Sequence, residues 1–135
     1  MNDRIFLDSN VLLYAFSTNE AEKRTTSLEI MHNKTCFTSL QALNEFCNVC
    51  VKKWSLERIK IEAALDYIIE QCEIGFILPM TLRTALALHE RYKFSFFDCI
   101  MLASALESGC NIFYTEDLAH GQVVDGRLTI INPFV

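Results

Sequence analysis

Short apolar runs alternate along the chain with longer segments in which apolar residues recur every three or four positions. The first run, Arg4–Asp8, is compact and ends in a carboxylate, which is typical of a buried strand. Similar runs predict further strands, and the expected set is 4–8, 35–38, 75–79, 111–115 and 128–131. The longer periodic segments predict helices over 11–16, 19–33, 39–53, 55–73, 81–93 and 95–108.

Local signals set the ends of several predicted elements. Ser39 is expected to cap the helix that follows it, and Gly109 to stop the strongly apolar helix that Ser95 opens. Pro79 closes the predicted strand 75–79, because proline lacks the N–H that a sheet needs. Since short strands alternate with helices throughout, the sequence predicts βαβ units and a mainly parallel sheet. In such a sheet the active site gathers at the carboxyl ends of the strands.

Composition is that of one globular domain. The chain has 135 residues, of which 51% are hydrophobic and 21% charged, with only four glycines and two prolines. The longest unbroken apolar run, Val11–Phe16, is too short to span a bilayer, and the start of the chain lacks the features of a signal peptide. We therefore expect a single domain over residues 1–135 in the cytoplasm.

The six cysteines are expected to be free thiols that pack as small hydrophobes. Cys47 and Cys50 form a C-x-x-C, but the pair falls inside a predicted helix and has neither a second such pair nor a histidine at zinc-site spacing. A packing role is therefore favoured over a redox or metal role.

The net charge is −5 and the pI about 5.1, which argues against a broad basic surface that holds nucleic acid. The acidity does not exclude an enzyme that acts on nucleic acid. A cluster of carboxylates around a divalent cation would also make a small protein acidic.

Four carboxylates are placed toward one end of the predicted sheet. Asp8 and Asp117 follow predicted strands, Glu45 lies about two turns into the helix 39–53, and Asp98 lies in the first turn of the helix 95–108. Each has a simpler explanation. Asp8 and Asp117 can start a helix, Glu45 can be an exposed helix residue, and Asp98 fits a capping box with Ser95. Four placements toward one edge of the sheet nevertheless favour a shared site.

Carboxylates that lie together repel one another, so they take up protons or require a cation. Mg²⁺ and Mn²⁺ prefer oxygen ligands, and a carboxylate-bound ion can activate water and stabilise a phosphate under attack. The chain has no Walker A or G-x-G-x-x-G motif, and no Ser-His or Cys-His pair stands out. His120 is a further candidate for contact with this site because it follows Asp117 closely.

Four segments resemble the motifs of a known family, the PIN-domain ribonucleases, of the type that serves as the VapC toxin in VapBC toxin–antitoxin pairs. In chain order they are Phe6–Ala15 (FLDSNVLLYA), Ser39–Phe46 (SLQALNEF), Phe94–Ala105 (FSFFDCIMLASA) and Tyr114–Gln122 (YTEDLAHGQ). The resemblance runs from Ile5 to Val135, so it covers nearly the whole chain.

The resemblance implies a three-layer α/β/α domain with a mainly parallel, roughly five-stranded sheet. It implies an endoribonuclease that depends on Mg²⁺ or Mn²⁺, acts on RNA, forms homodimers and is inhibited by a cognate antitoxin protein. The implied catalytic and metal-binding residues are Asp8, Glu45, Asp98 and Asp117. The implied supporting residues are Ser9, Asn10 and Thr115, with Glu116 as a further candidate ligand or supporting group.

Other interpretations stay open at this point. A receiver or phosphotransfer domain needs an acceptor Asp after a central strand and a Lys after a late strand. Here Pro79 and Asn132-Pro133 stand at those positions, so neither fits. A haloacid-dehalogenase-like phosphatase needs a second Asp where Asn10 stands, so it is also weaker. A catalytically silent module with the same fold is the main alternative. Four basic residues are candidates to guide RNA toward the site: Lys52, Lys53, Arg91 and Lys93. The simpler explanation is that they are solvated residues at helix ends.

Overall fold

The computed structural model describes residues 2–135, and within them six strands form one sheet in the order β3-β2-β1-β4-β6-β5. The strands are β1 (Arg4–Leu7), β2 (Thr35–Ser39), β3 (Cys72–Gly75), β4 (Ile112–Tyr114), β5 (Val123–Val124) and β6 (Leu128–Ile131). All neighbouring pairs are parallel except β5 with β6. The expected α/β class and mainly parallel sheet are confirmed, with one more strand than predicted.

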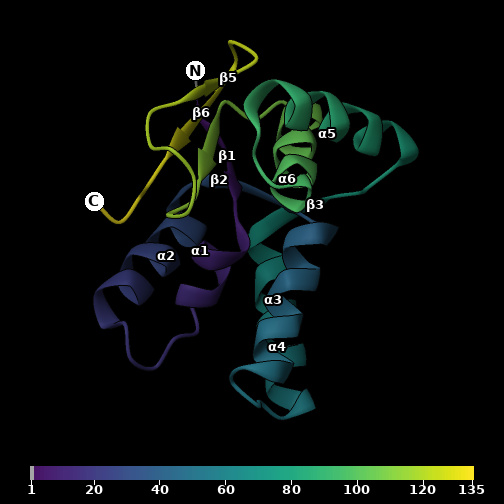
Figure 1. Ribbon diagram of the computed structural model, residues 1–135. Coiled ribbons are helices and arrows are strands. Elements are labelled where there is room, and N and C mark those ends of the chain that lie inside the picture. The colour runs from purple at the N-terminus through teal and green to yellow at the C-terminus, as the bar shows by residue number, and fades with distance from the viewer. Residues whose placement is uncertain (1) are drawn as a thin grey trace.

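Six helices between residues 2 and 135 connect these strands: α1 (Ser9–Tyr14), α2 (Ala21–Asn33), α3 (Leu40–Lys52), α4 (Arg58–Gln71), α5 (Pro79–Tyr92) and α6 (Phe96–Glu107). Figure 1 shows α1 and α2 on one side of the sheet and α5 and α6 on the other. This division follows from right-handed crossovers, because the chain moves outward from β1 to β3 and then returns across the sheet to β4. All six helices are too short or too polar to cross a bilayer.

The predicted strand at 75–79 is wrong. The third strand is β3, which ends at Gly75, and Gly75 pairs with Ser39 of β2. Pro79 does not close a strand but occupies the first turn of α5, where its missing N–H leaves no intrahelical bond unmade. The apolar residues before Pro79 therefore belong to the β3–α5 connection, and the helix predicted to reach residue 73 ends at Gln71.

Two local expectations also change. Ser39 stands at the N-cap of α3, but its side chain makes no capping bond and its buried Oγ has no hydrogen-bond partner. Strand β5 was not predicted. It forms a hairpin with β6 through Asp125 and Gly126, which both have positive φ, as a two-residue type I′ turn requires.

The core lies on both faces of the central strands. Phe6 of β1 stacks on Phe113 of β4 with ring centroids 5.1 Å apart, and both rings are fully buried. On α6, every residue from Cys99 to Leu106 is buried. The six cysteines are free thiols, and five of them are buried while Cys47 is half-buried, consistent with a packing role.

We expect Phe113→Ala to lower the free energy of unfolding by about 3–5 kcal/mol, because it removes a buried ring and leaves a cavity beside Phe6. Urea unfolding followed by circular dichroism measures this change. The matched control is Ile69→Ala, since Ile69 is 54% exposed on α4 and its truncation should change stability by less than about 0.5 kcal/mol. Equal effects of the two substitutions would contradict this account of the core.

Candidate active site

Asp8 stands at the centre of the candidate site, directly after β1. The register pairs Leu7 with Tyr114, so the residues that follow β1 and β4 emerge side by side. Asp8 caps α1 by accepting a hydrogen bond from the N–H of Ser9 at 2.6 Å, and its other oxygen accepts from the hydroxyl of Thr115 at 2.7 Å. The side chain is only 3% exposed, so this carboxylate is almost fully removed from water.

Asn10 links Asp8 to the segment after β4. Its Nδ2 lies 3.2 Å from Asp8 Oδ2, 3.0 Å from Thr115 Oγ1 and 3.0 Å from Asp117 Oδ2. Its Oδ1 accepts from the backbone N–H of Glu116 at 3.4 Å. Thr115 Oγ1 also accepts from the N–H of Asp117 at 3.1 Å. One amide therefore orients two carboxylates that lie more than a hundred residues apart in the chain.

Glu45 approaches the same site from α3. Its Oε1 accepts from the hydroxyl of Ser9 at 3.0 Å, and its Oε2 accepts from Nε2 of Gln41 at 3.1 Å. Gln41 was not singled out in the sequence, although its position four residues before Glu45 places the two on the same helix face. Ser9 thus connects Glu45 to Asp8, since its own backbone N–H binds Asp8.

Asp98 completes the group from the first turn of α6. Its N–H donates to the hydroxyl of Ser95 at 3.2 Å, so the capping interaction expected from the sequence is present. The carboxylate is half-buried and is close enough to Asp8, Glu45 and Asp117 for their charges to affect one another. Asp98 can therefore take part in the helix cap through its backbone N–H and in the site through its carboxylate.

The electrostatics of the group are unfavourable for four free anions. Burial, with smaller contributions from the charges of Asp98 and Glu45, raises the pKa of Asp8 to about 7, although hydrogen bonds from Thr115 and Ser9 oppose the increase. Burial also raises the pKa of Asp98, with Glu45 and Asp117 adding to the effect. The three ion pairs within residues 2–135 are Lys23–Glu116, Arg58–Glu62 and Arg91–Asp125, so none includes these carboxylates.

This donor set suits a hard divalent cation. It offers carboxylate oxygens, has no thiolate or imidazole among its contacts, and lacks a basic side chain that would neutralise it. Across residues 2–135, no three acidic, histidine or cysteine side chains converge as a preformed ligand shell. A bound ion would therefore have to draw the carboxylates together.

Glu116 is placed differently from the other candidates. Its carboxylate accepts from the Tyr14 hydroxyl at 2.5 Å and pairs with Lys23 at 3.0 Å, so it is turned to this pair rather than to the other acids. Only its backbone N–H reaches the site, through Asn10. The contacts of Tyr14 and Lys23 were missed. Tyr14 lies in the first motif segment, Phe6–Ala15, but was given no role there, and Lys23 lies outside all four motif segments.

The remaining candidates are more peripheral. His120 is exposed, and its Nδ1 accepts from the backbone N–H of Asn132 at 2.9 Å. Arg91 is paired with Asp125 at 2.9 Å, while Lys93 is an exposed helix C-cap in the left-handed region. Lys53 lines a hollow that also contains Asn10, so it is the basic residue with a described connection to the site.

Comparison with known proteins gives a family match and a fold match. The family model described as PIN domain matches residues 5–125. No curated protein matches the chain in sequence.

Several solved structures share the fold. VapBC2 from Rickettsia felis, bound to a promoter DNA fragment, has a TM-score of 0.70 at 15% identity and covers 96% of this chain and 98% of its own. A toxin–antitoxin complex from Klebsiella pneumoniae has a TM-score of 0.70 at 21% identity, covering 96% and 97%. VapC20 from Mycobacterium tuberculosis, a toxin that cleaves the sarcin–ricin loop, has a TM-score of 0.62 at 19% identity, covering 84% and 89%.

The raised pKa of Asp8 predicts a pH-dependent stability of the metal-free protein. Between about pH 4 and pH 7 folded Asp8 keeps a proton that the unfolded chain has lost, so the free energy of unfolding falls as the pH rises through this window. The fall attributable to Asp8 is at most roughly 4 kcal/mol. Urea unfolding in EDTA at about pH 5 and about pH 8 measures it.

Two variants isolate the contribution of Asp8. Asp8→Asn should reduce the decrease in the free energy of unfolding with rising pH. Asp66→Asn, which changes an exposed acid on α4, should leave that decrease as in the unmodified protein. An equally steep decrease with Asn at position 8 would show that other groups produce the pH dependence.

Proposed function

Because the chain belongs to the PIN domain family, we propose that it is a divalent-metal-dependent endoribonuclease that hydrolyses phosphodiester bonds in RNA, and that it is the toxin of a toxin–antitoxin pair. The observation that carries the proposal is a group of carboxylates that no Lys or Arg of residues 2–135 pairs with. Within it, Asn10 and Thr115 orient Asp8 and Asp117. The pKa of Asp8, which burial raises to about 7, supports the proposal, because strongly shifted pKa values are concentrated at functional sites.

The proposed cofactor is Mg²⁺ or Mn²⁺. Asp8, Asp98 and Asp117 are the proposed direct ligands, and Glu45 either joins them or orients the attacking water. An ion held there lowers the pKa of a water and offsets charge on the phosphate oxygens. The raised pKa values of Asp8 and Asp98 are consistent with this role, since a cation favours their ionised forms.

The other residues hold these groups in place. Asn10 donates to Asp8 and Asp117, and Thr115 donates to Asp8, which limits rotation of both carboxylates. Ser9 and Gln41 donate to separate oxygens of Glu45, which leaves that side chain oriented toward Asp8. In this arrangement Glu45 can accept a proton from a water that attacks phosphorus in line.

We further propose an antitoxin as protein partner. The similar structures named as VapBC2 and as a toxin–antitoxin complex support this proposal. The site is acidic and its carboxylates have no basic side chain paired with them, so it is complementary in charge to a basic segment of such a partner. That segment would cover the carboxylates and block access of the substrate. A short reading frame upstream of the gene, encoding a protein with a DNA-binding pattern, would support the pairing.

A homodimer is the proposed oligomeric state. Large apolar side chains are exposed along the β3–α5 connection and α5, and gathered apolar surface is typical of protein–protein contacts. They are Phe76, Leu78, Met80, Leu82 and Leu86. A second copy of the chain is the proposed cover for these residues.

Asp98→Asn and Asp8→Asn should each lower metal-dependent RNA cleavage by roughly 100-fold or more, because either change removes a proposed ligand charge. Cleavage of a structured RNA is measured with Mg²⁺ or Mn²⁺, and then with EDTA. The control is Asp66→Asn, purified in the same way, which should cleave like the unmodified protein. Full activity in a folded Asp8 or Asp98 variant would refute the proposed site and favour a contaminating ribonuclease or a silent module.

Leu86→Glu should shift the protein from dimer to monomer, because Leu86 is 58% exposed on α5 and a charge there would be buried in the interface. Sedimentation velocity reports the change. Ile59→Glu is the matched control, since Ile59 is 73% exposed on α4, outside the proposed interface. A dimer that survives Leu86→Glu, or an unmodified protein that is monomeric, would refute this interface.

A further inference from the structure

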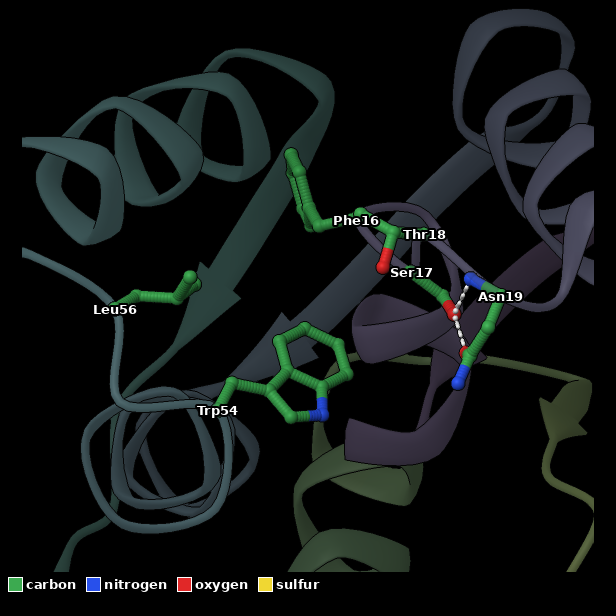
Figure 2. Close-up of a pocket in the computed structure, with 6 residues that line it drawn as sticks. All are labelled: Phe16, Ser17, Thr18, Asn19, Trp54 and Leu56. Carbon is green, nitrogen blue, oxygen red and sulfur yellow. Dashed lines mark hydrogen bonds between the residues drawn. The ribbon is translucent and has the colours of Figure 1, made fainter.

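Two adjoining hollows lie beside the candidate active site, between the α1–α2 connection and the end of α3. The larger has a volume of about 370 Å³, and its lining includes Asn10, Lys53 and Trp54. The smaller has a volume of about 230 Å³ and is lined by Trp54 together with Phe16 and neighbouring residues (Figure 2). Asn10 lines the larger hollow and also donates to Asp8 and Asp117, so this one side chain links the hollow to the carboxylate group.

Trp54 is common to both hollows, as are Ser17 and Asn19. Figure 2 shows the indole reaching from the end of α3 toward the loop that carries Ser17 and Asn19. The ring therefore borders both the hollow that contains Asn10 and the hollow that contains Phe16 and Leu56.

The backbone around Trp54 is held in place. The N–H groups of Lys53 and Trp54 both donate to the carbonyl of Val49, at 2.9 and 3.0 Å. Ser55 then takes a left-handed conformation with φ of 49°, and the N–H of Leu56 returns to the carbonyl of Cys50 at 3.0 Å. The backbone that carries the indole therefore has little conformational entropy left to lose on binding.

The chemistry of the lining fits a neutral, flat, polar-edged ligand. The indole supplies an aromatic face, and the Ser17 hydroxyl is bonded to Asn19 Oδ1 at 3.0 Å (Figure 2). The exposed Asn19 amide carries donors and an acceptor of the kind that pair with base edges. Lys53 and Glu20 both line the larger hollow, so it is not uniformly basic and does not favour a run of phosphates.

We propose that Trp54 is the stacking platform for one unpaired nucleotide of the RNA substrate, next to the phosphodiester bond that is cut. The proposal rests on the proposed ribonuclease function and adds a substrate class to it, namely RNA with an unstacked base beside the cleavage site. The base lies against the indole between Ser17 and Asn19, and Lys53 contacts an adjacent phosphate. A continuous duplex cannot use this site because its bases are stacked on one another.

Trp54 is the one tryptophan of the chain, so its fluorescence reports on this site directly. The full-length Asp98→Asn variant is titrated with a single-stranded RNA of about six nucleotides, which it should bind without cutting. Stacking should quench the fluorescence in a saturable manner. An abasic oligonucleotide with the same phosphates, and a blunt duplex of the same length, should quench far less.

Substitutions test the same site by kinetics. Trp54→Ala and Trp54→Leu should raise KM for a single-stranded or loop-containing RNA by about 5-fold to 100-fold, while Trp54→Phe retains most of the affinity. Trp54→Leu keeps an apolar side chain for packing, so a shared defect of the two variants identifies loss of stacking rather than loss of fold. Ile69→Ala, which removes an exposed apolar side chain on α4, away from the proposed dimer interface, should leave KM unchanged.

The outcomes separate this proposal from the proposed function. The stacking site alone is overturned if the protein cleaves RNA with metal but shows no base-dependent quenching and Trp54→Ala leaves KM unchanged. An apolar segment of a protein partner is then the favoured occupant of the hollow. Equal quenching by abasic and base-containing RNA also overturns it. Base-dependent quenching without any RNA cleavage by the unmodified protein supports the binding site while refuting the ribonuclease function.

Discussion

The parallel pairing of β1 with β4 is the constraint on which the site depends. It sets Leu7 opposite Tyr114, so Asp8 and Thr115 leave the sheet together and their side chains meet at 2.7 Å. The connections after these two strands run in opposite directions, toward β2 and toward β6, which opens the crevice where ligands of α/β sheets commonly bind. Helices α3 and α6 then need to contribute only one carboxylate each, Glu45 and Asp98.

This arrangement places one carboxylate of the group, Asp8, where water screens its charge poorly. The stacked rings of Phe6 and Phe113 lie one residue before Leu7 and Tyr114, so the apolar core extends almost to Asp8. Burial of that carboxylate is tolerated because Ser9, Asn10 and Thr115 all donate to it, yet these hydrogen bonds do not offset the whole effect on its pKa. The fold thus stabilises a site whose ionisation still favours a cation.

The sequence predicted the strand ends better than the contacts between them. Asp8, Asp98 and Asp117 were placed by local patterns, because an apolar strand or an N-cap signal stands directly before each. The β3 error arose where an apolar run before Pro79 resembled a strand, and β5 was missed although Asp125-Gly126 is a strong turn signal. Gln41, Lys23 and Trp54 could not be assigned, because their contacts depend on how α3, α2 and the α1–α2 loop pack.

The net charge of −5 acquires a physical meaning from this packing. Four acids belong to one group, and Arg91, one of the basic residues first considered for RNA, is engaged by Asp125. With a net charge of −5 the protein gains little overall from counterion release, so we expect contacts to the backbone of the proposed RNA substrate to contribute little to its binding. Substrate affinity would then have to come from uncharged contacts close to the scissile bond. A rigid indole that shares a hollow with Asn10 can supply such contacts without adding positive charge that would compete for the carboxylates.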